Sequence, residues 1–237
     1  MKRKIYGRGK VALKFAILLV LCQPIISLAG DFTFSSSGTI GPNDVYDNVY
    51  VENNGTIVDM TGGQVSSLSM YDSSIFNLYD GQISGFFGGI SISSLSTINV
   101  LGGTIDKNVD FVVDGNANFT GGNITDYRLK TYKDSIVTFT GGSLNFDYFD
   151  IQGGMDIRGG DLTVDDVGLH IESVINIFSE NYNYNADSKV LTAYLIDAGY
   201  LSMSGLDQLE YDSINFVPEP TTLLLLSLGG LFLRTRR

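Results

Sequence analysis

The chain has few of the side chains on which most enzyme sites depend. Its 237 residues include one cysteine, Cys22, and one histidine, His170. A single cysteine excludes an internal disulfide and a cysteine-based zinc site. His170 follows Leu169 in an alternating run, which is typical of a solvent-facing strand residue. The sequence shows no nucleophile elbow, phosphate loop or zinc spacing, so we expect no catalytic residue, cofactor site or metal site.

Positive charge is scarce between residues 30 and 216. This part carries six lysines and arginines against twenty-five acidic residues, a formal net charge of −19. Such a surface repels nucleic acid and anionic lipid, so we expect no nucleic-acid partner. The remaining cations lie at the two ends of the chain, six in the first fourteen residues and three in the last four.

The N-terminus has the three parts of a secretory leader. Basic residues from Lys2 to Lys14 precede an apolar run, Phe15–Ile26, and Ser27-Leu28-Ala29 supplies small residues before Gly30. This pattern predicts a signal peptide over residues 1–29, cut by signal peptidase between Ala29 and Gly30. A lipoprotein signal ending at Cys22 is the alternative, but Leu21 is bulky for the position before that cysteine.

The C-terminus also has three parts. Val217-Pro218-Glu219-Pro220 precedes an apolar segment, residues 221–233, and the chain ends in a basic cluster of Arg234, Arg236 and Arg237. At ~1.5 Å per residue, a helix of this segment would cover about two-thirds of a ~30 Å hydrocarbon core. We therefore expect a short transmembrane helix that holds the chain transiently at the inner membrane.

This tail closely resembles the PEP-CTERM sorting signal of Gram-negative bacteria that make exopolysaccharide. The resemblance implies membrane retention by the apolar segment, a cytoplasmic basic stop, and recognition near Pro218-Glu219-Pro220 by a membrane transpeptidase, the exosortase. The logic parallels lipid-anchor signals whose hydrophobic tail is recognised and removed. An ordinary C-terminal anchor helix with a positive-inside flank is the alternative, and in that case the tail would be retained.

Between the two ends lies a repeat of about twenty residues. A Gly-Gly pair, Asp-Gly in one case, recurs with its second glycine at positions 63, 81, 103, 122, 142 and 160. Alignment on this glycine gives apolar columns five and three residues before it and two residues after it. A polar column, Asp59, Asn77, Asn99, Asn118, Thr138 and Asp156, lies between the first two. A fixed period of this length is the signature of a solenoid, and the alternation predicts a strand with one buried face.

These columns predict an all-β fold, a right-handed parallel β-helix of about seven to eight coils over residues 30–178, with a degenerate first coil. We expect sharp turns between short strands at the glycines, and a second strand in each coil, including 167–171 in the last. The Asn77-Asn99-Asn118 column could form an amide ladder. A left-handed solenoid lacks the six-residue motif it needs, and a Greek-key sandwich does not explain the columns.

Residues 179–216 break the repeat, and the glycine signal stops at residue 160. We expect this segment to form a capping β region, a hairpin that closes the open sheet edges of the last coil. The resulting domain organisation is signal peptide 1–29, β-helix 30–178, cap 179–216 and sorting signal 217–237.

The leading functional prediction is a non-enzymatic protein of the cell surface or extracellular matrix, exported and sorted by its tail, and associated with exopolysaccharide. Two alternatives stay open. A carbohydrate-active lyase or glycosidase would need converging carboxylates, and Arg128, Lys130 and Lys133 with Asp126 and Asp134 are the best place to search for its site. A carbohydrate- or ice-binding adhesin would need an aromatic row, from Tyr71, Tyr79, Tyr127 and Tyr148, or a threonine array, from Thr61, Thr120 and Thr140.

Overall fold

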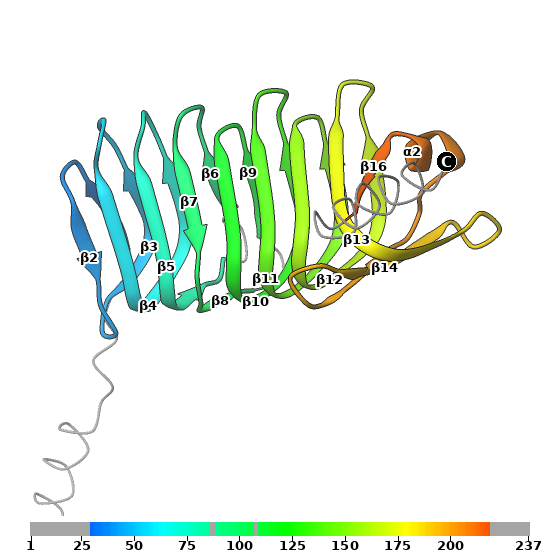
Figure 1. The fold of residues 1–237 in the computed structure, drawn as a ribbon. Helices are drawn as coiled ribbons and strands as arrows, with labels where there is room; N and C mark the ends of the chain where they lie inside the picture. The colour runs from blue at the N-terminus through cyan, green and yellow to red at the C-terminus, as the bar shows by residue number, and fades with distance from the viewer. Residues whose placement is uncertain (1–28, 86–88, 107–108, 219–237) are drawn as a thin grey trace, which may run out of the picture.

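The structure is a computed structural model that describes residues 29–85, 89–106 and 109–218, apart from the side chains of Asp126 and Tyr127. The described residues form a parallel β-solenoid of about seven turns, which confirms the predicted fold class (Figure 1). Equivalent strands of successive coils pair in parallel, as in β10 with β11 and β11 with β12. This parallel pairing makes the sandwich alternative wrong, because sandwich sheets are antiparallel.

The elements follow one another from the N-terminal to the C-terminal end of the solenoid. The strands are β1 (Gly30–Phe34), β2 (Gly38–Ile40), β3 (Val45–Val51), β4 (Ile57–Met70), β5 (Ile75–Ile83), β6 (Gly89–Ile92), β7 (Thr97–Val100), β8 (Thr104–Ile105), β9 (Asp110–Val113), β10 (Asn116–Thr131), β11 (Ile136–Ile151), β12 (Gly154–Leu169), β13 (Val174–Asn185), β14 (Val190–Leu195), β15 (Tyr200–Met203) and β16 (Ile214–Val217). A short helix, α2 (Gln208–Asp212), precedes the last strand.

The predicted apolar columns form the core. All eighteen residues in the three columns of the six glycine-marked coils are buried, with at most 1% of each side chain exposed. Phe119 and Phe139 are partners in the register of β10 and β11, and their rings stack with centroids 4.7 Å apart. Side chains that repeat at one position of the coil therefore build continuous ladders along the solenoid axis.

In most of the glycine-marked coils the glycine lies at a bend inside a long strand, which corrects the predicted break between short strands. The coil of Gly103 keeps the predicted break, because β7 ends at Val100 and β8 begins at Thr104. β4, β10, β11 and β12 each continue through the glycine pair, with a register irregularity at that point. Gly142 shows why a side chain is excluded: its φ is +94°, and a Cβ there would lie 2.7 Å from the Gly121 carbonyl oxygen. Because every coil bends at the same place, ladder hydrogen bonds resume on both sides of the bend.

The opposite corner of the coil is lined by small hydroxyl residues that the sequence alignment missed. Seven residues before the column glycine lie Thr56, Ser74, Ser96 and Ser135, all buried, and Ser173 holds the same corner in the next coil. Ser96 donates to the Asp72 carbonyl oxygen at 2.9 Å, and Ser135 donates to that of Tyr132 at 2.6 Å. The four serine hydroxyls each donate to a backbone carbonyl oxygen where the chain turns, so none of these buried donors is left unpaired.

The outward polar column forms the amide ladder that the sequence suggested. The Asn77 amide donates to Asp59 at 2.7 Å, Asn99 to Asn77 at 2.7 Å and Asn118 to Asn99 at 2.9 Å. A second segment links Asn176 to Asp156 at 2.8 Å and Asn215 to Asn176 at 3.1 Å. In each bond the amide of one coil donates to the oxygen of the coil before it.

The C-terminal segment is more than a capping hairpin. β13 and β14 pair antiparallel, as do β14 and β15, but β15 then returns to the solenoid and pairs in parallel with β12. Leu201 lies beside Leu162 in that register, so Gly199 continues the glycine column that we expected to stop at Gly160. A Cβ at Gly199 would lie 2.2 Å from the Gly160 carbonyl oxygen. The hairpin is thus an insertion between the first strand of the last coil and its glycine.

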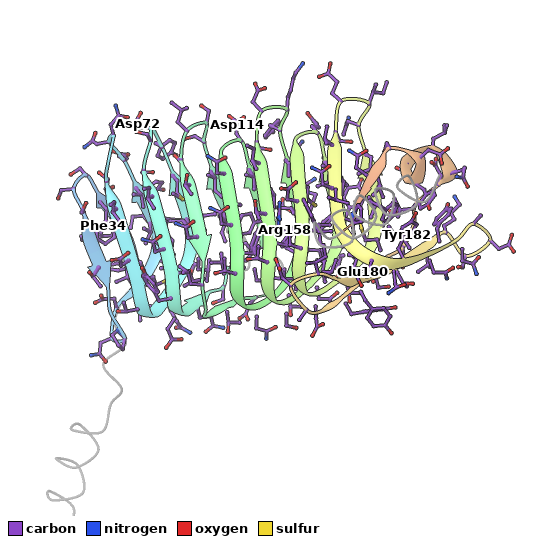
Figure 2. All side chains as sticks on the ribbon, in the orientation of Figure 1. Phe34, Asp72, Asp114, Arg158, Glu180 and Tyr182 are labelled. Carbon is purple, nitrogen blue, oxygen red and sulfur yellow. The ribbon has the colours of Figure 1, made fainter. Side chains whose placement is uncertain are left out.

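Because β16 ends at Val217, the cap extends one residue beyond its predicted end, and from here on the cap means residues 179–217. It ends in β16, which pairs in parallel with the first half of β13 and begins one more coil. Tyr182 lies on the cap, and Phe34 lies at the opposite end of the solenoid (Figure 2). Phe34 is 8% exposed and its ring covers Gly38. The predicted second strand 167–171 ends early: β12 stops at Leu169, so His170 follows the strand and Ile171 is fully exposed in a turn.

Candidate functional site

The junction between body and tail lies at the end of β16. Val217 is the last residue of this strand and is paired with Phe178 of β13. The strand therefore extends one residue into the segment we assigned to the sorting signal. Pro218 is the last described residue, and the other predicted sorting residues, Glu219, Pro220, Arg234, Arg236 and Arg237, lie outside the described part of the chain. The processing segment thus begins where the folded body ends.

The junction is held by aromatic stacking. The Phe216 ring lies parallel to that of Tyr182, with centroids 3.7 Å apart, and Tyr184 stacks on Tyr211 at 4.1 Å. The Tyr184 hydroxyl donates to the Leu206 carbonyl oxygen at 3.0 Å. β16 is only four residues long, so contacts from the inserted hairpin supply much of what fixes it.

The N-terminal junction has a similar placement. Gly30, the residue that would follow the predicted cut, is the first residue of β1, and Ala29 directly precedes the strand. β1 pairs in parallel with β3, so the strand belongs to the solenoid sheet. The leader itself, residues 1–28, lies outside the described residues. The predicted cut and the start of the fold fall at the same residue.

Arg128, Lys130 and Lys133, the cations of the candidate enzyme site, each form an ion pair. Arg128 contacts Asp110 at 2.9 Å, Lys130 lies 3.7 Å from Asp150, and Lys133 lies 2.6 Å from Glu172. Each lysine or arginine that we considered as a base is thus paired with a carboxylate on another coil, the adjacent one for Arg128 and Lys130 and the second one along for Lys133. The side chain of Asp126, named with this cluster, is outside the description.

His170 lies at the edge of the same face. Its Nε2 is 2.8 Å from the Asp150 carboxylate, and the residue is exposed, as the alternating pattern predicted. Burial raises the pKa of Tyr148 on the same face, and the charges of Asp150 and Asp166 raise that pKa further. Shallow hollows of about 300 Å³ lie on either side of His170, one against α2 and one beside Lys133. These contacts do not recur from coil to coil, so the repeat pattern in the sequence did not predict them.

Two further predictions concern metals and membranes. Within residues 29–85, 89–106 and 109–218, no group of three or more His, Cys, Asp or Glu side chains has the geometry to hold a metal ion. In the same part of the chain, no helix has both the length and the apolar character that crossing a bilayer requires. The predicted membrane segment, residues 221–233, lies outside this part.

The predicted threonine array is interrupted, and the described tyrosines of the predicted aromatic row, Tyr71, Tyr79 and Tyr148, do not line up. Thr61, Thr120 and Thr140 each turn their hydroxyl to a carbonyl oxygen of the preceding coil, at 3.3–3.4 Å. Tyr79 and Leu101 interrupt this column, and both are exposed. Tyr71 and Tyr79 are exposed but occupy different positions of the coil, and Tyr148 lies over Gly168. The side chain of Tyr127 lies outside the description.

Comparison with protein-family models identifies the tail. Residues 216–237 match the PEP-CTERM protein-sorting motif. The PEP-CTERM motif begins at Phe216, inside β16, and covers the Pro-Glu-Pro, the apolar segment and the basic end. It implies an exported chain that is sorted to the cell envelope and processed by an exosortase. Neither the curated proteins nor the solved structures gave a match, so the motif is the observation that bears on function.

Proposed function

We propose that this chain is the precursor of a non-enzymatic envelope or matrix protein, a β-solenoid that associates with exopolysaccharide. Signal peptidase removes residues 1–29, and an exosortase acts near Val217-Pro218-Glu219-Pro220 while residues 221–233 hold the chain in the inner membrane. The PEP-CTERM match, which begins inside the last strand and runs to the end of the sequence, carries the proposal.

The positions of the two junctions support this processing scheme. Removal of residues before Gly30 leaves β1 complete, and a cut after Val217 leaves β16 paired with β13. The body released by both cuts keeps its whole core, because the buried hydrophobic residues of the described chain lie between Phe34 and Ile214. Processing at these points changes what the body is attached to and leaves its fold intact.

Contacts on the charged face support the non-enzymatic role. A lyase or glycosidase needs an uncommitted base or two carboxyl groups held around a substrate. Lys130 and Lys133 are instead paired with acids, and Asp150 is shared between Lys130 and His170. These are the contacts of a surface ion-pair network that links neighbouring coils.

The test compares the full chain in a host that has its exosortase with the same host lacking that enzyme. Intact mass spectrometry should give a product that begins near Gly30 and ends near Pro218–Pro220 only when the exosortase is present. Glu219→Ala should leave the C-terminal segment attached, whereas Asp212→Ala, an exposed acid just upstream, should be processed normally.

A product that keeps residues 221–233 in the presence of the exosortase would contradict the scheme and favour a permanent anchor.

The non-enzymatic role has its own test. The full chain should release no reducing ends or unsaturated products from neutral and acidic polysaccharides, with or without calcium. Release that is lost in Lys130→Ala would establish an enzyme.

A further inference from the structure

A row of uncharged polar side chains crosses six strands of the solenoid and the cap. Successive strand pairings place its members side by side: Asn183 beside Thr192, Thr192 beside Ser202, Ser202 beside Thr163, Thr163 beside Asn145, and Asn145 beside Thr125. We call these six residues the polar strip. With strands about 4.8 Å apart, the strip is ~24 Å long.

The side chains of the polar strip are uncommitted. None of the six makes a side-chain hydrogen bond or an ion pair within the described residues, and all are exposed or half-buried. The amide ladder on the neighbouring face differs, because each of its amides is bonded to the next coil at 2.7–2.9 Å. The polar strip therefore offers a line of hydroxyl and amide groups to a partner, whereas the amide ladder satisfies itself.

A second row runs alongside and contributes aromatic rings. Register places Asn181 beside Tyr194 and Tyr194 beside Tyr200. Tyr194 is 68% exposed and Tyr200 38%, and the two rings meet edge to face with centroids 5.5 Å apart. A hollow of about 140 Å³ opens beside Tyr194, Asn183 and Thr192. Exposed tyrosines next to free amides are an arrangement suited to a ligand with an apolar face and a hydroxylated rim.

Charge narrows the class of ligand. The body carries a formal net charge of −19, but the polar strip has no charged member. The second row includes one acid, Asp161, whose carboxylate accepts the backbone N–H of Tyr200 at 3.1 Å. The surrounding negative field disfavours nucleic acid and acidic glycans. An uncharged sugar chain meets no such repulsion, and its hydroxyl groups match both the donors and the acceptors of Asn, Thr and Ser.

We infer that the polar strip binds an extended, uncharged polysaccharide that runs across the strands, with sugar rings packed on Tyr194 and Tyr200. This rests on the proposed export, which places the body where such polymers occur. The inference assigns the glycan contact to the inserted hairpin and the adjoining coils, on the side of the coil that follows the glycine column. The hairpin extends the surface by two strands beyond the last regular coil.

The experiment measures depletion of the full chain, kept in a sugar-free non-ionic detergent, by insoluble neutral glucans and by gels of an acidic polysaccharide. We expect saturable binding to a neutral polymer and little to the acidic one. The double variant Tyr194→Ala/Tyr200→Ala should weaken that binding about tenfold, because each stacked ring contributes modestly. The corresponding Phe variant should keep most of it, since the rings remain.

Tyr71→Ala and Tyr79→Ala are matched controls, because both rings are similarly exposed but lie away from the polar strip. Equal weakening by the controls, preferred binding to the acidic gel, or no binding to any neutral polymer would overturn the inference. Thermal unfolding of each variant checks the fold. None of these results depends on processing, which the mass measurement reports separately, so failure of the polar strip and failure of the sorting scheme are distinguishable.

Discussion

In the coils from β4 to β12, a core side chain has an equivalent above or below it in the next coil, whereas the contacts of the cap occur once. Phe119 stacks on Phe139 as one step of a ladder, but Tyr182 stacks on Phe216 across a long stretch of sequence with no repeat of the pair. In a solenoid, stability is approximately a sum of coil terms and neighbour terms. The coils therefore spread their stability over many similar contacts, and the end of the molecule depends on a few unique ones.

The largest effect should come from breaking a ladder in the coils. Phe139→Asp would bury an unpaired charge between Phe119 and Phe149, at a cost of several kcal/mol in the free energy of unfolding. Asn118→Ser, on the outward side of the neighbouring coil, removes one hydrogen bond to Asn99 and should cost about 1 kcal/mol. Urea unfolding of both variants makes the comparison. Equal losses would show that the assignment of inner and outer columns is wrong.

A smaller loss is expected where the coils and the cap meet. Gly199→Ala forces a Cβ against the Gly160 backbone at a φ of +120°, so we expect a loss of about 3 kcal/mol, seen as faster hydrogen exchange in β15 and β12. Gly55→Ala is the control, because Gly55 also has a positive φ, +79°, but no atom lies within 4 Å of its added Cβ. If the two variants behaved alike, Gly199 would be only a turn residue and not a member of the glycine column.

The smallest effect is a weakening of the cap at alkaline pH. Desolvation raises the pKa of both Tyr184 and Tyr211, and nearby acids including Asp212 add to the increase. A raised pKa in the folded state means that the neutral phenol is stabilised there. This contribution is complete below the ordinary tyrosine pKa of about 10 and is lost as the pH rises through the folded-state value.

Limited proteolysis after Tyr211 or nearby residues, followed from pH 8 to pH 11, should report this weakening as faster cleavage of the cap. Tyr211→Phe keeps the ring against Tyr184 but cannot ionise, so its cleavage should depend less on pH. An unchanged pH profile in Tyr211→Phe would exclude this tyrosine as the titrating group.

The same contrast explains what the sequence could predict. Val58, Phe76 and Ile98 each lie five residues before the column glycine, so alignment on that glycine predicts their burial and register. The same alignment predicts the ladder of Asn77, Asn99 and Asn118. Gly199 was missed because the inserted hairpin separates it from its own first strand, although Leu201 two residues later fits the apolar column. The small residues at the second corner, Thr56, Ser74, Ser96 and Ser135, also lie at one distance from the column glycine.

The site was less predictable than the fold. A terminal motif identified the tail because Pro-Glu-Pro, an apolar segment and basic residues stand together in sequence. The polar strip joins residues as far apart as Thr125 and Asn183, and antiparallel pairing in the cap brings Thr192 and Ser202 into line with parallel coils. Thr125, Asn145, Thr163 and Ser202 each lie three residues after a column glycine, so this part of the strip follows the repeat. Thr192 and Asn183 belong to the inserted hairpin, and no periodic spacing marks them.

The hairpin inserted before Gly199 indicates how this fold tolerates changes in length. The coil recovers its alignment at Gly199, which occupies the narrow position beside Gly160, although the hairpin precedes it. The chain can therefore gain or lose surface segments at this bend without shifting the strands on either side. For protein engineering, the bend after the first strand of the last coil is an acceptor site for grafted peptides, and the grafted segment would emerge beside the paired strands β12 and β15.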